Sequence, residues 1–262
     1  MIFRKIARAS ALLLVTATLY PLLVLSLLLL LPLPGIRLRV RNGLFRLWSR
    51  LCLRIFGCRL RIEGEVPRAP FFLVCNHLSY VDIPVLSAIV GAYFIAKLEI
   101  RGWPALGVLS RTVGTIFVDR ELRRDVQRVN EIVGKTLDRG YGIVLFPEGT
   151  SSQGYEIMPF KSALLAYPTG QGMPIHSASL SYAVPEAEIP AHLSIAWWGD
   201  APFVGHFVQL LGIRSFEVTV RFSDQVEVGR DRKEVSRRLH ERVSEGFVPV
   251  VSVEDRAFDP GF

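Results

Sequence analysis

Residues 71–82 read Phe-Phe-Leu-Val-Cys-Asn-His-Leu-Ser-Tyr-Val-Asp, an apolar run followed directly by polar side chains. The apolar part predicts a short buried strand, and the polar residues mark the turn at its end. Similar patterns follow along the chain, with strands predicted at 93–96, 115–118 and 143–146 and a helix at 126–137. Strands that alternate with helices predict an α/β fold, a largely parallel central sheet flanked by helices.

The rest of the chain extends the same pattern. Three more apolar runs predict strands, at residues 175–180, 193–197 and 216–222, and another helical pattern begins near Asp231. A chain of 262 residues is long enough for one such domain and an anchor. We therefore expect a catalytic domain over residues 63–253 and an irregular tail at 254–262.

The N-terminal segment is apolar, with no charged residue from Ala9 to Ile36. If it were helical throughout, it would exceed the roughly 30 Å hydrocarbon core of a bilayer. Pro21 leaves a second arrangement open, a hairpin that enters and leaves one leaflet, because proline kinks a helix. Pro32-Leu-Pro-Gly35 does not fit a signal-peptide cleavage site. We expect residues 1–36 to form a membrane-embedded helix or hairpin that anchors the protein.

Basic residues are concentrated in the same part of the chain. The first 62 residues contain 11 Lys and Arg and no Asp or Glu, whereas the other 200 contain 20 basic and 24 acidic residues. Most of these N-terminal charges follow the apolar segment rather than precede it. For a single span, the positive-inside rule then predicts a catalytic domain that faces the cytoplasm from the inner (cytoplasmic) membrane.

Residues 37–62 predict a basic amphipathic segment. After a linker at Asn42-Gly43, apolar residues and arginines fall on different faces of a helix that extends to Phe56. This helix would either lie along an anionic membrane surface or pack its apolar stripe on the domain itself. No DNA-binding motif accompanies the charge, so we expect no nucleic acid partner.

Polar residues follow three of the predicted strands, which is where active sites form in open α/β sheets. His77 and Asp82 belong to the first cluster, and they can meet if His77 precedes a helix and Asp82 lies in its first turn. A carboxylate on one imidazole nitrogen would make the other nitrogen a general base for an alcohol. Alternatively, Ser79 and Asp82 would cap the helix and Asn76 would cap the turn.

The other two clusters are Arg120 and residues 147–152. In the second of these, backbone N–H groups could face a developing oxyanion and Glu148 could hold a polar head group, although an ordinary surface turn has the same composition. Arg120 is either a clamp for a substrate anion or a surface residue in a salt bridge.

Other kinds of site find less support in the sequence. The three cysteines form no Cys-x-x-Cys pair and the histidines lack metal-ligand spacing, so we expect reduced thiols and no metal. A lipid hydrolase would need an exposed nucleophile, and no Gly-x-Ser-x-Gly motif is present. A non-catalytic membrane adaptor would not need the His77 and Asp82 pair.

Taken in order, four motifs carry a resemblance to a known family. They are His77-x4-Asp82, Phe117-Val-Asp-Arg120, Phe146-Pro-Glu-Gly-Thr150 and Met173-Pro174-Ile175. The set resembles the glycerolipid acyltransferases, which include 1-acylglycerol-3-phosphate acyltransferases, over roughly residues 63–198. The resemblance implies His77 as the base and Asp82 as its partner. It also implies contacts to the polar head of the acceptor from Arg120, Glu148 and Gly149, with Pro174 in the wall of the site. Asn76 and Thr150, which stand beside these motifs, are further candidates for substrate binding.

One position departs from the family pattern. The family usually has arginine after Gly-Thr, where it is expected to help bind a phosphate monoester, and this chain has Ser151. Lys161 is a second candidate to bind the head group in its place. The Glu-Gly-Thr-Ser motif, followed by Pro159-Phe160-Lys161, looks like the branch that includes lyso-ornithine lipid acyltransferases.

These features predict an O-acyltransferase that moves a fatty acyl chain to the free hydroxyl of a lysolipid in the membrane. A 1-acylglycerol-3-phosphate type of acceptor follows from the family, and lyso-ornithine lipid is the alternative. The donor is expected to be acyl-CoA or acyl carrier protein, with no bound cofactor.

Overall fold

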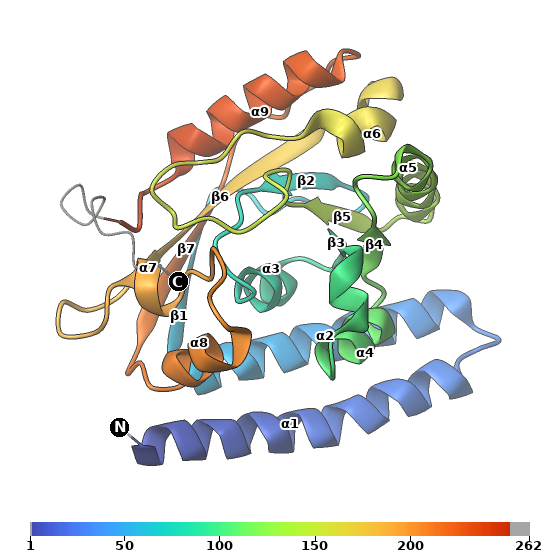
Figure 1. The fold of residues 1–262 in the computed structure, drawn as a ribbon. Coiled ribbons are helices and arrows are strands. Elements are labelled where there is room, and N and C mark those ends of the chain that lie inside the picture. The colour runs from blue at the N-terminus through green and yellow to red at the C-terminus, as the bar shows by residue number, and fades with distance from the viewer. Residues whose placement is uncertain (1, 252–262) are drawn as a thin grey trace.

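The computed structural model describes residues 2–251, in which seven strands form one mixed sheet (Figure 1). In chain order the strands are β1 (Cys58–Glu63), β2 (Phe72–Cys75), β3 (Ala92–Lys97), β4 (Ile116–Val118), β5 (Gly142–Leu145), β6 (Ile175–Ala183) and β7 (Phe216–Phe222). Their order across the sheet is β1-β7-β6-β2-β5-β3-β4. The predicted tail at 254–262 lies outside the described residues.

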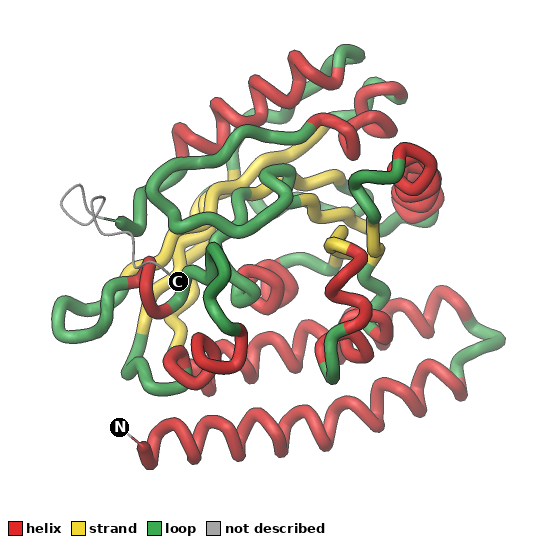
Figure 2. Tube along the Cα trace, viewed as in Figure 1, coloured by secondary structure: helices red, strands yellow, loops and turns green. Residues whose placement is uncertain are grey.

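Helices cover both faces of this sheet (Figure 2). They are α1 (Ile2–Leu29), α2 (Pro34–Phe56), α3 (Asp82–Ile89), α4 (Leu106–Thr112), α5 (Arg123–Asp138), α6 (Ala166–Gly170), α7 (Ala191–Ser194), α8 (Phe203–Leu210) and α9 (Arg232–Gly246), with the 3-10 helices η1 (Leu98–Gly102) and η2 (Ser162–Leu165). One apolar core lies between the sheet and α2, α3 and α8, and a second core lies under α5 and α9.

The predicted α/β class with a largely parallel sheet is confirmed. Strands β6, β2, β5, β3 and β4 run parallel to one another. Only β7 is antiparallel to β6, and β1 then pairs with β7 in parallel. The carboxyl ends of β2 and β5 therefore lie side by side, which brings the residues after Cys75 next to those after Leu145.

Three local predictions were wrong or incomplete. Residues 193–197 form no strand, because Ile195 and Ala196 donate backbone bonds to the Ala191 carbonyl in the turn of α7. The predicted linker Asn42-Gly43 lies inside α2, where packing against α1 and α3 outweighs the weak helix propensity of this pair. Residues 58–62, the end of the predicted amphipathic segment, belong to β1, where exposure alternates from Cys58 to Arg61.

Helix α1 is continuous through Pro21, so the chain does not form a hairpin at that residue. It is the one helix among residues 2–251 that is long and apolar enough to cross a membrane. In the structure it lies along the domain beside α2 (Figure 1). Its start is held by Arg4, which donates to the Gly212 carbonyl at 2.8 Å, and by Arg8, which donates to the Arg214 carbonyl at 2.9 Å.

Asn76 extends the pairing between β2 and β6. Its side-chain amide donates to the Leu180 carbonyl at 2.9 Å and accepts from the Leu180 N–H at 2.7 Å, and the residue is fully buried. Both polar ends of the amide are thus used within the fold. The side chain fixes the end of β2 directly before His77 and is not free to bind substrate as predicted.

We predict that Asn76→Ala lowers the free energy of unfolding by about 2–4 kcal/mol, because two buried backbone groups of Leu180 lose their partners. The measurement is denaturant unfolding of the purified full chain. The control is Gln225→Ala, since Gln225 is an exposed amide whose side chain makes no such pair. Equal unfolding free energies for the two variants would contradict the role assigned to Asn76.

Candidate active site

His77 and Asp82 meet at the carboxyl end of β2. The imidazole Nδ1 lies 2.7 Å from Asp82 Oδ2, with His77 in the turn and Asp82 as the first residue of α3. The Leu78 and Ser79 N–H groups donate to the same oxygen at 2.7 and 2.9 Å. The Asp82 carboxylate, in the first turn of α3, thus accepts from N–H groups of the turn that precedes the helix. This arrangement explains why five positions separate His77 from Asp82.

Tyr182 in β6 completes the environment of the carboxylate. Its hydroxyl donates to Asp82 Oδ1 at 2.6 Å, and Asp82 is fully buried. Burial, together with the nearby charge of Asp82, raises the pKa of Tyr182 well above its ordinary value. The phenol therefore stays protonated and acts as a donor. No motif in the sequence identified Tyr182, because 100 residues separate it from Asp82.

The arrangement leaves His77 Nε2 available. With the proton on Nδ1 directed at Asp82, the lone pair on Nε2 makes no hydrogen bond within the described residues. The imidazole stacks on Phe146, with ring centroids 4.2 Å apart, and its side chain is 22% exposed. It is therefore held in one orientation while one edge stays open to a substrate.

Glu148 supports His77 from the other side. Its Oε1 accepts from the His77 N–H at 2.6 Å and its Oε2 accepts from the Met158 N–H at 2.9 Å. Burial raises the pKa of Glu148 to about 7, although both backbone donors favour the charged form. Since both oxygens are bonded to backbone groups, Glu148 fixes the catalytic turn and does not face a head group as the sequence suggested.

Arg120 and Lys161 converge on Gly149. A Cβ at Gly149 would clash with Arg120 Nη1 and would come within 3.2 Å of Lys161 Nζ, so glycine lets both cations approach the turn. Arg120 Nε and Nη1 are buried without a hydrogen-bond partner among residues 2–251. Burial lowers the pKa of Arg120, and the charge of Glu99 opposes that shift. Two adjacent cations beside the exposed Thr150 form a site for an anion.

Ser151 and Pro174 are the remaining residues that the sequence singled out. The Ser151 hydroxyl donates to the Trp197 carbonyl, which ties this turn to the segment after α7. Pro174 directly precedes β6, and β6 is parallel to β2 with Ile175 opposite Phe72. Pro174 therefore lies at the amino edge of the sheet, away from His77. Its predicted place in the wall of the site came from the resemblance alone and is wrong, because a residue that precedes a parallel strand lies at the edge opposite to the residues that follow β2.

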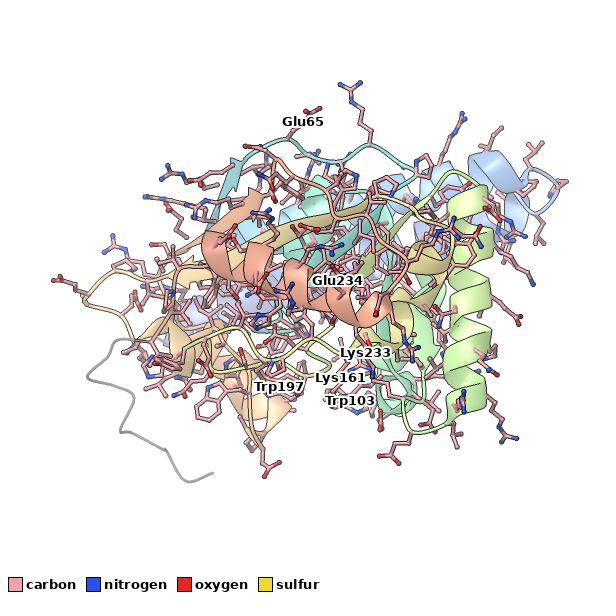
Figure 3. All side chains as sticks on the ribbon, turned by 90° about the horizontal axis from the view of Figure 1, so that it is seen from above. Glu65, Trp103, Lys161, Trp197, Lys233 and Glu234 are labelled. Atoms are coloured by element: carbon pink, nitrogen blue, oxygen red, sulfur yellow. The ribbon has the colours of Figure 1, made fainter. Side chains whose placement is uncertain are left out.

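A large apolar cavity opens beside His77. Its volume is about 520 Å³, and its wall combines residues of α1, α2, α3, α4 and α8. Examples are Leu12, Thr16, Trp48 and Phe207. Trp103 and Trp197, whose ring centroids are 5.9 Å apart, also line it (Figure 3). The N-terminal helix α1 thus contributes to the cavity, and no pattern in the sequence predicted this contact.

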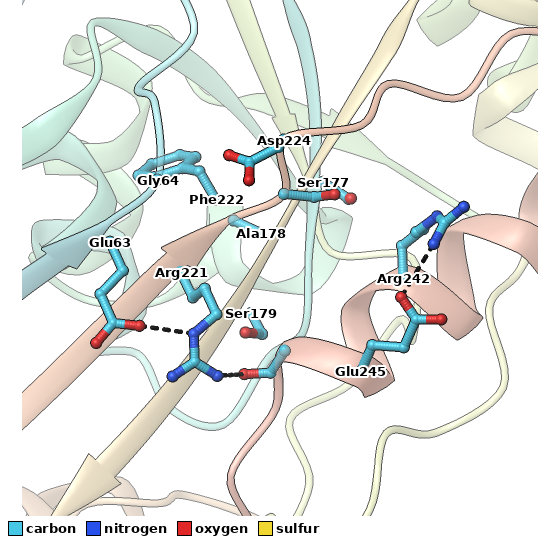
Figure 4. Close-up of a pocket in the computed structure, with 12 residues that line it drawn as sticks. Glu63, Gly64, Ser177, Ala178, Ser179, Arg221, Phe222, Asp224, Arg242 and Glu245 are labelled. Carbon is cyan, nitrogen blue, oxygen red and sulfur yellow. Dashed lines mark hydrogen bonds and ion pairs between the residues drawn. The ribbon is translucent and has the colours of Figure 1, made fainter.

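A second, polar pocket of about 350 Å³ lies on the other face of the sheet (Figure 4). Ser177, Ala178 and Ser179 of β6 line it, and Ala178 also belongs to the core on the side of α3. Arg221 in its wall donates to Glu63 at 2.6 Å and to the Gly246 carbonyl at 2.8 Å. This pocket contains no part of the His77 site.

Comparisons with known proteins agree with this geometry. The Acyltransferase family model matches residues 59–181. The lyso-ornithine lipid O-acyltransferase of Rhizobium meliloti is 35% identical over 222 residues, which cover 79% of this chain and 75% of that protein. The 1-acyl-sn-glycerol-3-phosphate acyltransferase of Neisseria gonorrhoeae is 39% identical over 125 residues, 47% of this chain and 49% of that protein.

The fold also has a solved counterpart. The crystal structure of the 1-acyl-sn-glycerophosphate acyltransferase from Thermotoga maritima superposes with a TM-score of 0.63 at 21% identity, covering 92% of this chain and 97% of the other. This likeness supports the fold, and the sequence relatives support the family. The chain belongs to the acyltransferase family that acts on lysolipids.

Proposed function

We propose that this protein transfers a fatty acyl chain from a thioester donor, acyl-CoA or acyl carrier protein, to the hydroxyl of lyso-ornithine lipid. The observation that carries the proposal is His77 Nε2, an open base backed by a fully buried Asp82 at the edge of a large apolar cavity. A base without a protein nucleophile suits direct attack by an alcohol.

The chemistry follows from this geometry. His77 Nε2 takes the proton of the acceptor hydroxyl as its oxygen attacks the thioester carbonyl, and the negative oxygen that forms is stabilised by a backbone N–H group of the turn after β5. The Gly149 N–H is not that group, because it donates to the Phe146 carbonyl. The C–S bond then breaks, and the leaving thiolate takes the proton from His77. Asp82 keeps Nδ1 protonated throughout and stabilises the imidazolium. The apolar cavity accommodates an acyl chain.

The cation pair and Ser151 favour the ornithine head group. Arg120 and Lys161 can bind the singly charged carboxylate of the ornithine head group through charge-assisted hydrogen bonds. A phosphate monoester carries more charge, and position 151, where the family has a third cation, is a serine bonded to a backbone carbonyl. Relatives that cover about three quarters of this chain are named for lyso-ornithine lipid. Glu99 near Arg120 is available to the ornithine ammonium.

The position of α1 fits a protein held in one leaflet. Arg4 and Arg8 hold its start against the segment after α8, and its far end turns directly into α2. If α1 crossed the bilayer, these contacts would bring the domain into the hydrocarbon. We infer that α1 lies within the cytoplasmic leaflet of the inner membrane, with the exposed Arg39 and Arg54 of α2 available to anionic head groups. Arg46 and Arg50 instead donate to the Ala88 carbonyl in α3. Lipid acceptor then arrives from the bilayer and the donor from the cytoplasm.

We predict acyl transfer to lyso-ornithine lipid when it is offered beside lysophosphatidic acid with labelled acyl-CoA and acyl carrier protein as donors. His77→Ala should lower the rate by about 10²–10⁴-fold, the usual contribution of a general base. His176→Ala is the matched control, since His176 lies in β6 away from the cavity lining. Preferred transfer to lysophosphatidic acid would overturn the acceptor, and full activity of His77→Ala would overturn the mechanism.

We predict that Ser151→Arg shifts preference toward lysophosphatidic acid. A third cation beside Arg120 and Lys161 should raise the ratio of kcat/KM for lysophosphatidic acid over lyso-ornithine lipid by about tenfold or more, as expected for one charge-assisted hydrogen bond. Ser151→Ala separates this effect from loss of the bond to Trp197 and should leave the ratio unchanged. Equal ratios in the two variants would show that position 151 does not select the head group.

A further inference from the structure

Helix α8 has an apolar outward face. None of its residues is charged at neutral pH, because burial lowers the pKa of its one titratable residue, His206. Phe203 and Phe207 line the cavity on its inner side. On its outer side Val204 is 71% exposed and Val208, one turn later, is 43% exposed. A surface helix in water normally presents charged or polar residues outward. An outer face of two valines indicates that α8 does not face water.

The apolar surface of α8 adjoins that of α1. Arg8 donates to the Leu211 carbonyl at 3.3 Å and Arg4 donates to the Gly212 carbonyl, so the start of α1 is fixed to the residues that follow α8. The outward side of α1 is also apolar, with Phe3 84% and Leu13 72% exposed. Both helices lie on the same side of the sheet, α8 beside the first half of α1 (Figure 1).

The dimensions of a leaflet are sufficient to include both helices. A helix with its side chains is roughly 10 Å across, and the hydrocarbon of one leaflet is roughly 15 Å deep. A leaflet that contains α1 is therefore deep enough to reach the helices that pack on α1. Trp103 and Trp197 contact Phe203 at the start of α8, with ring centroids 5.7 and 6.1 Å apart. Tryptophan is typical of the boundary between lipid and water.

We propose that α8 is a second membrane-contacting element, which inserts Val204 and Val208 into the leaflet that holds α1. This inference rests on the membrane placement given under the proposed function. Its consequence is that the cavity, which Phe203 and Trp103 line, opens within the lipid. The lysolipid then reaches His77 sideways from the bilayer without leaving it for water.

Labels at single cysteines test the contact. Val204→Cys and Val208→Cys would carry an environment-sensitive fluorophore, and Val228→Cys is the matched control because Val228 is 52% exposed and lies beside α9. The native thiols should not react near neutral pH, because burial raises the pKa of Cys52 and Cys58 to about 12 and that of Cys75 well above its ordinary value.

The labelled full-length protein is bound to vesicles of equal amounts of phosphatidylcholine and phosphatidylglycerol. The expected result is blue-shifted emission at positions 204 and 208 that is quenched by lipids brominated on their acyl chains, with neither effect at 228. Emission at 204 like that at 228 would overturn the proposal. A blue shift without quenching would also overturn it, since a second copy or another protein would then cover α8. This readout does not depend on activity.

Activity provides the second test. Replacement of both Val204 and Val208 by Asp should lower transfer to a long-chain lysolipid in vesicles by about tenfold, because charged residues are disfavoured in lipid. Transfer to a short-chain acceptor dissolved in water should be unchanged. The control replaces Val226 and Val228, both exposed, by Asp. Equal loss with both acceptors, or no loss, would contradict the lipid contact; if the wild type acylates no lysolipid, the proposed function fails instead.

Discussion

The carboxylate of Asp82 is the group on which the site depends. It is fully buried and accepts hydrogen bonds from two backbone N–H groups, from His77 and from Tyr182. A buried charge is costly unless it is fully hydrogen-bonded, so the turn after β2, the start of α3 and strand β6 must all adopt one arrangement together. Glu148 adds a second anchor to the same turn through the backbone of His77. The base is therefore oriented before any substrate arrives.

The second constraint is that the site includes part of the N-terminal helix. Leu12 and Thr16 of α1 line the cavity beside His77, and Trp48 of α2 donates to the Thr16 hydroxyl at 3.0 Å. The helix that we propose to lie in the membrane thus also forms part of the cavity wall. This position suits the proposed reaction, in which a lipid acceptor meets a water-soluble donor. The proposed attachment and catalysis then share one structure.

Many of the strands and helices, and the pairing of His77 with Asp82, could be predicted from local sequence patterns. Strand β7 was predicted with its observed bounds, and the spacing of His77 and Asp82 indicated a turn followed by a helix. What could not be predicted depends on contacts between distant segments. Tyr182 reaches Asp82 only because β6 pairs with β2, Asn76 bonds to Leu180 for the same reason, and Pro174 is distant because β6 is parallel. The sequence pointed to Glu148 as a site residue. Its hydrogen bonds to the backbone N–H groups of His77 and Met158 could not be predicted from the residue type.

The proposed role of His77 is to activate the acceptor hydroxyl for direct attack, without an acyl-enzyme. The most direct measurement combines initial rates, with donor and acceptor varied together, and the mass of the protein after incubation with donor alone. We predict intersecting double-reciprocal lines and an unchanged protein mass. Parallel lines together with a protein heavier by one acyl group would contradict it, because the acyl chain would then pass through a covalent intermediate on a side chain.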